Sequence, residues 1–291
     1  MNYLEKEAIQ VLEGVKLSNI FRTFFLLHSG NLIWKTKGEG KEFFEHREYH
    51  IGDDIKNINW KVFARTGKLF TKIFSSEISK DAIVLLDTSN SMLAGKEETK
   101  LEYSKFLVSV LAYKLISEGY NVLFSSFNDN LARMYEISDK NFLRFQNLLT
   151  TTKCSGITNF KNVWLELAHS VRKRVNIVIV SDFLFLERDD IINLRWLFPN
   201  NSIVLFEVLS GEEIKFFDGG FLELVNPEDD ESKVLSSNSS VKQRYLERMA
   251  NFIEMITHNC LKNQISFSTF SISEPYYITL KKLYLDILFK V

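Results

Sequence analysis

Two stretches of the sequence constrain the fold more than any other feature. "AIVLLD" (82–87) and "VNIVIVSD" (175–182) are continuous apolar runs of strand length, and each ends in an aspartate. A strand that is apolar at every position is buried on both faces, as in a parallel sheet that helices cover on each side. The sequence therefore predicts an α/β protein whose central sheet contains these two runs.

Helices and strands alternate along the rest of this region, which favours a doubly wound, mostly parallel sheet. Apolar residues at helical spacing predict helices over 100–119, 140–150, 159–173, 188–198 and about 240–261, with a final helix at the C-terminus. Further strands are predicted at 121–127, 132–137 (an edge strand), 202–209 and 265–272, with a hairpin within 219–236.

Residues 1–80 differ in character from the rest. Helical apolar spacing over 3–28 is followed by a stretch, 38–80, that is dense in charged and aromatic residues and contains one apparent strand, "KLFTKIF". We expect 1–80 to form a helical and β segment that lacks its own core and packs on the sheet. Residues 81–291 would then form the main α/β domain.

Composition excludes several classes of protein. The net charge of -1 gives no general attraction to nucleic acid or to anionic membranes. The two cysteines, Cys154 and Cys260, have no metal-ligand spacing and fit a reducing compartment. The charged N-terminus is unlike a signal peptide, and the apolar stretches are too short to span a bilayer. We therefore expect a cytoplasmic protein without a membrane span.

Oxygen-bearing side chains follow the two buried strands and precede one helix. Asp87 is followed by Ser89 and Ser91, Asp182 ends the second run, and Thr158 lies in "CSGITNF" just before a predicted helix. The carboxyl ends of parallel strands meet at one edge of a sheet, where ligands bind. Carboxylates and hydroxyls without His or Cys suit Mg²⁺ or Mn²⁺. The sequence therefore predicts a divalent-metal site made from three loops.

Each of these residues also has an ordinary structural explanation. Asp-x-Ser-x-Ser is a common turn, and an Asp at a strand end often caps the next helix. Thr151 and Thr152 are nearby alternatives to Thr158. The order of the three loops favours the metal site over these separate explanations.

The set Asp87-x-Ser89-x-Ser91, then Thr158, then Asp182 resembles the metal-ion-dependent adhesion site of von Willebrand factor A domains. This resemblance implies that the two serines coordinate the metal directly and that the threonine does so in one conformation. It implies that the aspartates act largely through water. It also implies an open metal position for a Glu or Asp of another protein.

A second resemblance covers the charged segment before the sheet. "FFEHREYHIGDDIKNINWKVFARTGKLFTKIFSSE" (43–77) is similar to the signature of the bacterial domain of unknown function 58 family. The shared positions are Arg47, Tyr49, Gly52, Asp53, Asp54, Ile58, Trp60, Ala64, Arg65 and Glu77, whereas Asn59 stands where that family usually has Asp. We expect an ion-pair lattice of Arg47, Arg65, Asp53 and Asp54, with Trp60 as an anchor.

The resemblance to this family implies a von Willebrand A-type domain and a MoxR-type AAA+ ATPase as partner. The chain has no G-x-x-x-x-G-K-[ST] run, so ATP hydrolysis would have to come from that partner. We therefore expect a non-catalytic, metal-dependent protein-interaction module that serves as an adaptor.

Two other functions stay open at this point. A metal-dependent phosphoryl hydrolase would need a second acid two residues after Asp87, where Ser89 stands, and a phosphate-binding lysine. Nucleic-acid binding would use the basic residues of 35–72, but acids interleave with them and favour a mixed surface.

Overall fold

The computed structural model describes residues 42–49, 55–75, 80–216, 221–225, 232–236, 239–276 and 278–279. The chain divides into two compact units, one made of Ser29–Ile78 and the other including Ser79–Val291. The helices predicted over 3–28 and at the C-terminus fall outside the described residues.

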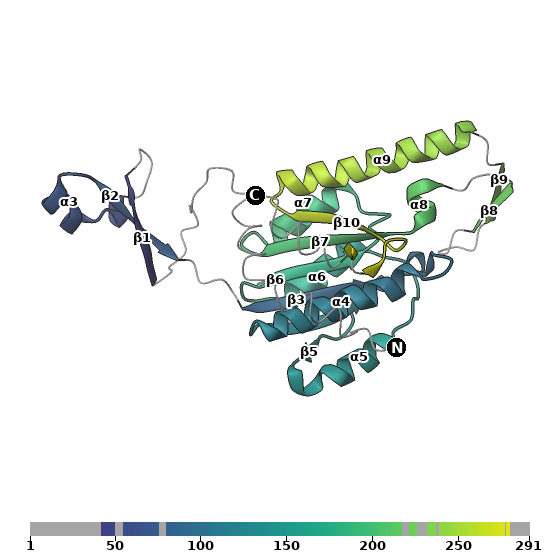
Figure 1. The fold of residues 1–291 in the computed structure, drawn as a ribbon, viewed down its shortest axis with the longest axis horizontal. Coiled ribbons are helices and arrows are strands. Elements are labelled where there is room, and N and C mark those ends of the chain that lie inside the picture. The colour runs from purple at the N-terminus through teal and green to yellow at the C-terminus, as the bar shows by residue number, and fades with distance from the viewer. Residues whose placement is uncertain are drawn as a thin grey trace. The chain divides into compact units, whose positions relative to one another are not determined.

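A six-stranded sheet forms the centre of the larger unit (Figure 1). Its strand order is β10-β7-β6-β3-β4-β5, and within it only β5 runs antiparallel, at one edge. The strands are β3 (Asp81–Asp87), β4 (Asn121–Phe127), β5 (Tyr135–Ile137), β6 (Asn176–Ser181), β7 (Ser202–Leu209) and β10 (Ser266–Ser271). The predicted doubly wound, mostly parallel sheet is therefore confirmed.

The two apolar runs that end in Asp are central neighbours in this sheet. After β3 the chain adds β4 and β5 on one side, and then returns to add β6, β7 and β10 on the other. The strand order therefore reverses between β3 and β6, which is where open α/β sheets bind their ligands.

Helices cover both faces of the sheet because its strands are apolar on both. On one face, Val84 and Leu86 pack with α4 (Lys100–Ser117) and α5 (Phe142–Thr151). On the other face, Ile83 and Leu85 pack with α6 (Phe160–Ser170), α7 (Arg188–Leu197) and α9 (Ser239–Lys262). In Figure 1, α4 lies over β3 and α9 runs beside β10.

Several short elements complete the larger unit. A helix that was not predicted, α8 (Gly211–Lys215), follows β7, and the Ser210 side chain caps it. The predicted hairpin is confirmed as β8 (Phe221–Val225) and β9 (Ser232–Ser236). Two 3₁₀ turns are η2 (Asn90–Leu93) and η3 (Asp139–Asn141). Among the described residues, none of the helices combines the length and the apolarity that crossing a bilayer requires.

The smaller unit contains an antiparallel pair, β1 (Glu42–Glu48) and β2 (Phe70–Ser75), with η1 (Ile55–Asn57) and α3 (Trp60–Thr66) between them. Asn59 caps α3, because its Oδ1 accepts hydrogen bonds from the Lys61 and Val62 amides. An Asn at this family position therefore keeps the capping role that an Asp would have.

The family signature is only partly described. Asp53 and Asp54 of the predicted ion-pair lattice lie outside the described residues. Trp60 is 58% exposed and meets Phe63 edge-on within α3. Its anchoring role, like the packing of residues 1–80 on the sheet, stays a prediction.

Replacing Leu107 of α4 tests the packing of the core. Leu107 is buried, so we expect Leu107→Ala to lower the free energy of unfolding by about 2–5 kcal/mol. Urea titration followed by circular dichroism measures this loss. Leu143→Ala on α5, where the side chain is 75% exposed, is the matched control and should change stability by less than about 0.5 kcal/mol. Equal losses in both variants would contradict the assigned packing.

Candidate functional site

The first loop of the candidate site begins where β3 ends. Asp87 is fully buried, and its Oδ1 accepts a hydrogen bond of 2.8 Å from the Ser89 amide. This bond turns the chain so that the Ser89 and Ser91 hydroxyls face each other, with their Oγ atoms 3.0 Å apart. Both serines are buried, so the Asp-x-Ser-x-Ser run forms a compact group of oxygen atoms at the sheet edge.

The second loop brings Thr158 onto the same carboxylate. Its Oγ1 lies 3.1 Å from both Oδ1 and Oδ2 of Asp87. Backbone hydrogen bonds hold the two loops together, from the Ser155 amide to the Thr88 carbonyl and from the Asn90 amide to the Gly156 carbonyl. Gly156 has a φ of 68°, a left-handed conformation that favours glycine.

The two alternative threonines do not reach the site. The Thr151 and Thr152 hydroxyls both donate to the Leu148 carbonyl at the end of α5. Of the three threonines that the sequence left open, Thr158 is therefore the one that contacts Asp87.

The end of β6 and the third loop, which follows it, contribute two adjacent residues, Ser181 and Asp182, that have different partners. The Ser181 hydroxyl donates to Asp87 Oδ2 at 2.6 Å. Asp182 turns away from this contact, and its Oδ2 accepts a hydrogen bond of 2.6 Å from the Lys100 ammonium. Asp182 still lies close enough to Asp87 for its charge to raise the pKa of that carboxyl.

Asp87 is a carboxylate in an unfavourable setting. Burial, and then the charge of Asp182, raise the pKa of Asp87 to about 6, although the hydrogen bonds from Ser181 and Ser89 oppose this rise. Within the described part of the chain, no lysine or arginine forms an ion pair with it. The site therefore contains a buried negative charge that only hydroxyl and amide groups offset.

Lys100 is a buried cation close to the site, but its ammonium pairs with Asp182 and Glu213 and not with Asp87. Its side chain has 0% exposure, and its ammonium bonds Asp182 at 2.6 Å and Glu213 of α8 at 2.7 Å. Burial opposes the charged ammonium, but Asp182 and Glu213 outweigh this effect and raise the pKa of Lys100. Lys100 thus connects the start of α4, the end of β6 and α8.

The sequence analysis missed Lys100, Ser181 and Glu213. A weak signal existed for Lys100, because a lysine in the first turn of an apolar helix opposes the helix dipole and needs a nearby acid. Ser181 could also have been predicted from the sequence. Adjacent residues of a strand point to opposite faces of the sheet, so Ser181 and Asp182 cannot both face the same side. Glu213 gave no signal, since its helix was not predicted.

The residues at this edge fit a hard divalent cation. The carboxylate of Asp87 and the hydroxyls of Ser89, Ser91 and Thr158 are the oxygen donors that Mg²⁺ and Mn²⁺ prefer. A cation here would also neutralise the buried charge of Asp87. Among the described residues, no group of three or more His, Cys, Asp or Glu side chains could hold a metal, so such a cation would depend on the hydroxyls.

A further buried carboxyl, that of Glu207, lies on β7 near Asp182. Glu207 has Oε2 2.8 Å from the Thr269 hydroxyl, while its buried Oε1 has no hydrogen-bond partner. Burial is the main reason that the pKa of Glu207 rises to about 7. Asp182 and Glu213 raise it further, and Lys100 lowers it. Glu207 therefore holds its proton at mildly acidic pH.

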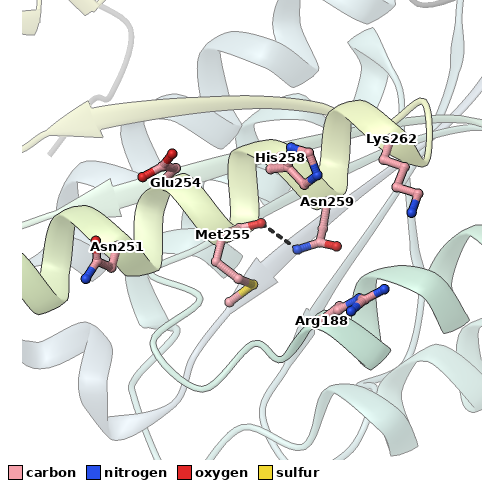
Figure 2. A pocket seen from close by; sticks show the side chains of 7 residues that line it. All are labelled: Arg188, Asn251, Glu254, Met255, His258, Asn259 and Lys262. Atoms are coloured by element: carbon pink, nitrogen blue, oxygen red, sulfur yellow. Dashed lines mark hydrogen bonds between the residues drawn. The ribbon is translucent and has the colours of Figure 1, made fainter.

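A separate groove lies between the start of α7 and α9 (Figure 2). Its volume is about 460 Å³, and it is lined by Arg188, Asn251, Glu254, Met255, His258, Asn259 and Lys262. The Asn259 amide donates to the Met255 carbonyl within α9, as the dashed line in Figure 2 marks. The groove contains none of the residues of the three loops, and charges of both signs surround it.

The chain matches a known protein family over most of its length. The family model described as "Protein of unknown function DUF58" covers residues 45–252, more than half of the chain. The protein therefore belongs to this family, which confirms the resemblance seen in its signature. No curated protein matches the chain.

The solved structures to which the chain shows similarity include three proteins at 13–17% identity. One is the conserved hypothetical protein BatB from Bacteroides thetaiotaomicron (14% identity, TM-score 0.42, 71% of this chain and 96% of that chain). Another is an aerotolerance-related membrane protein from Bacteroides fragilis NCTC 9343 (17% identity, TM-score 0.43, covering 71% of this chain and 98% of that chain). A third is the von Willebrand factor A (VWA) domain of SpRpn10 (13% identity, TM-score 0.40, covering 71% of this chain and 95% of that chain).

Replacing Lys100 tests its role as the buried cation. Lys100→Met keeps the side-chain volume but leaves Asp182 and Glu213 unpaired, so we expect a loss of about 3–5 kcal/mol in the free energy of unfolding. Urea titration at pH 7, with a chelator to keep the protein metal-free, measures this loss of stability.

Lys105→Met on the same helix is the matched control. The partner of Lys105, Glu102, is 42% exposed and stays hydrated without it, so we expect a loss below about 1 kcal/mol. The triple variant Lys100→Met/Asp182→Asn/Glu213→Gln should recover much of the stability lost in Lys100→Met. A loss in Lys100→Met no larger than in Lys105→Met would show that the ion pairs contribute little.

The raised pKa of Glu207 predicts a pH dependence of stability. Glu207 in the folded protein has a pKa of about 7, above its ordinary value of 4.5. Its protonated form therefore contributes stability that is fully present below about pH 4.5 and is lost as pH rises through 7. Between pH 5 and pH 8 we expect the wild type to lose roughly 2 kcal/mol more than Glu207→Gln, which mimics the protonated form. Urea titrations at both pH values measure the difference, and parallel losses would contradict the assignment.

Proposed function

We propose that this protein is a divalent-metal-dependent protein-interaction module. The observation that carries the proposal is the buried Asp87 carboxylate, which no lysine or arginine of the described chain neutralises and which hydroxyl groups from separate loops surround. A bare buried charge disfavours folding, whereas a bound cation would turn the same charge into a stabilising contact.

The residues of the site have different tasks in this proposal. Asp87, Ser89, Ser91 and Thr158 would hold Mg²⁺ or Mn²⁺. Ser181 and the Ser89 amide orient the Asp87 carboxylate through their hydrogen bonds. Asp182, engaged by Lys100, would act on the cation at longer range or through water, which agrees with the role that the adhesion-site resemblance implies.

The bound metal would supply a Lewis-acidic position for a carboxylate oxygen of another protein. Family resemblance suggests a MoxR-type AAA+ ATPase as that protein, with this chain as an adaptor in complex assembly. The described cysteines, Cys154 and Cys260, are free thiols, as suits the cytoplasmic setting that we propose.

A phosphoryl hydrolase is the less favoured alternative. Lys100 is the cation beside the site, but its ammonium is buried and bonded to two carboxylates, so it is poorly placed to bind a phosphate. Ser89 occupies the place of a second acid and lies against Ser91. The interaction module therefore accounts for these side chains better than phosphate chemistry does.

Metal binding predicts a thermal shift that depends on Asp87. Wild-type protein should melt higher in millimolar MgCl₂ or MnCl₂, by roughly 5–10 °C if the metal exceeds its Kd about 100-fold. Asp87→Asn should lose this response. Because the pKa of Asp87 is raised, removing its charge should not destabilise the metal-free protein, so lost binding can be distinguished from misfolding.

The matched control is Asp139→Asn, an exposed carboxylate in η3 that should leave the shift unchanged. Pull-down of a MoxR-type ATPase, with and without chelator, then tests the adaptor role in the wild type and in Asp87→Asn. A wild-type protein without any response to Mg²⁺ or Mn²⁺ would rule out the metal-dependent module.

A further inference from the structure

Each of the three loops of the candidate site exposes one large apolar side chain. Leu93 is 51% exposed, Ile157 is 47% exposed and Phe185 is 53% exposed. We call these three residues the apolar rim. Single exposed apolar residues are common on protein surfaces and need no explanation, but one in each loop of a single site is a pattern.

The rim residues are held outward because their neighbours are held inward. Met92, beside Leu93, is fully buried in the core. Phe183 is fully buried and stacks on Phe160, and a turn closed by the Leu186 amide on the Phe183 carbonyl leaves Phe185 outside. The third rim residue, Ile157, follows Gly156, whose carbonyl accepts the Asn90 amide of the first loop.

The rim lies close to the oxygen donors. Leu93 comes two residues after Ser91, Ile157 directly precedes Thr158, and Phe185 comes three residues after Asp182. Consecutive Cα atoms are about 3.8 Å apart, so each Cα of the rim lies within roughly 11 Å of a candidate ligand's Cα. A protein segment bound at the site would therefore lie within reach of these three residues.

The charge of the surface formed by the three loops is not enough to select a ligand. The exposed charged residues of the same loops have both signs, namely Lys96, Glu97, Lys153 and Glu187. A free anion would gain little from such a mixture. The features that the three loops share are buried or half-buried oxygen-bearing residues and one exposed apolar side chain in each loop.

We propose that the occupant of this surface is a protein segment in which a Glu or Asp is flanked by apolar side chains. The carboxylate would fill the cation site, and the flanking side chains would pack on Leu93, Ile157 and Phe185. The inference rests on the proposed function, because without a cation the Asp87 charge repels a carboxylate. It adds the chemistry that selects one acidic segment over another.

Synthetic peptides test this preference. The probes are acetylated, amidated Ala-Leu-Glu-Leu-Ala, Ala-Ser-Glu-Ser-Ala and Ala-Leu-Gln-Leu-Ala, titrated into the Mg²⁺-loaded full chain and followed by NMR. We expect the Leu-Glu-Leu peptide to bind about tenfold more tightly than Ser-Glu-Ser, since part of two leucine side chains leaves water. The Gln peptide should not bind.

The variant Leu93→Ser/Ile157→Ser/Phe185→Ser should abolish the tenfold preference while keeping the Mg²⁺ thermal shift. The control Leu143→Ser/Trp196→Ser/Leu261→Ser removes three apolar side chains that are exposed elsewhere and should keep both. Equal binding of the two Glu peptides to wild type, no binding of either, or a preference that survives in the rim variant would overturn the inference while the metal shift still stands. Loss of the shift in wild type would instead refute the proposed function itself.

Discussion

The pairing of β3 with β6 at the centre of the sheet decides where the polar groups of this protein lie. Both strands are apolar between their end residues, so helices bury them on both faces, and the two strands pair side by side. Their parallel register then places the residues after Leu86 and Val180 at the same edge, where the strand order reverses. The contacts of Asp87 with Ser181 and Thr158 follow from this arrangement.

The concentration of carboxyl groups at this edge creates an electrostatic problem that the chain solves in two ways. Asp182 and Glu213 share the buried ammonium of Lys100, so their charges are compensated inside the protein. Asp87 has hydroxyl and amide donors instead, and its pKa is raised because burial and the charge of Asp182 disfavour the ionised form. This difference is the physical reason for placing Asp87, and not Asp182, at the centre of the proposed cation site.

The same edge joins the site to the rest of the fold. Lys100 begins α4, Asp182 follows β6, and Glu213 belongs to α8, so one ammonium holds three elements together. The apolar residues of the loops divide between the core and the surface, with Met92 and Phe183 inside and Leu93 and Phe185 outside. Buried side chains beneath exposed ones would support the binding surface that we propose.

Most of the larger unit could be predicted from local patterns. The apolar runs defined the central strands, and period-3.6 spacing defined α4, α6, α7 and α9, because these signals need only a short window of sequence. The short helix α8 was missed because five residues give too little periodicity. Two loops of the candidate site were found from the residue types that follow the buried strands, and the third from the threonine that precedes a predicted helix.

The sequence by itself determined the layered fold and the oxygen-rich loops, since burial and strand direction are written into nearby residues. Only the tertiary structure decided which groups meet. It selected Thr158 over Thr151 and Thr152, and it brought Lys100 to Asp182 across 82 residues. Such contacts depend on how loops from distant strands converge and on which buried charges need a partner, and no local pattern records either.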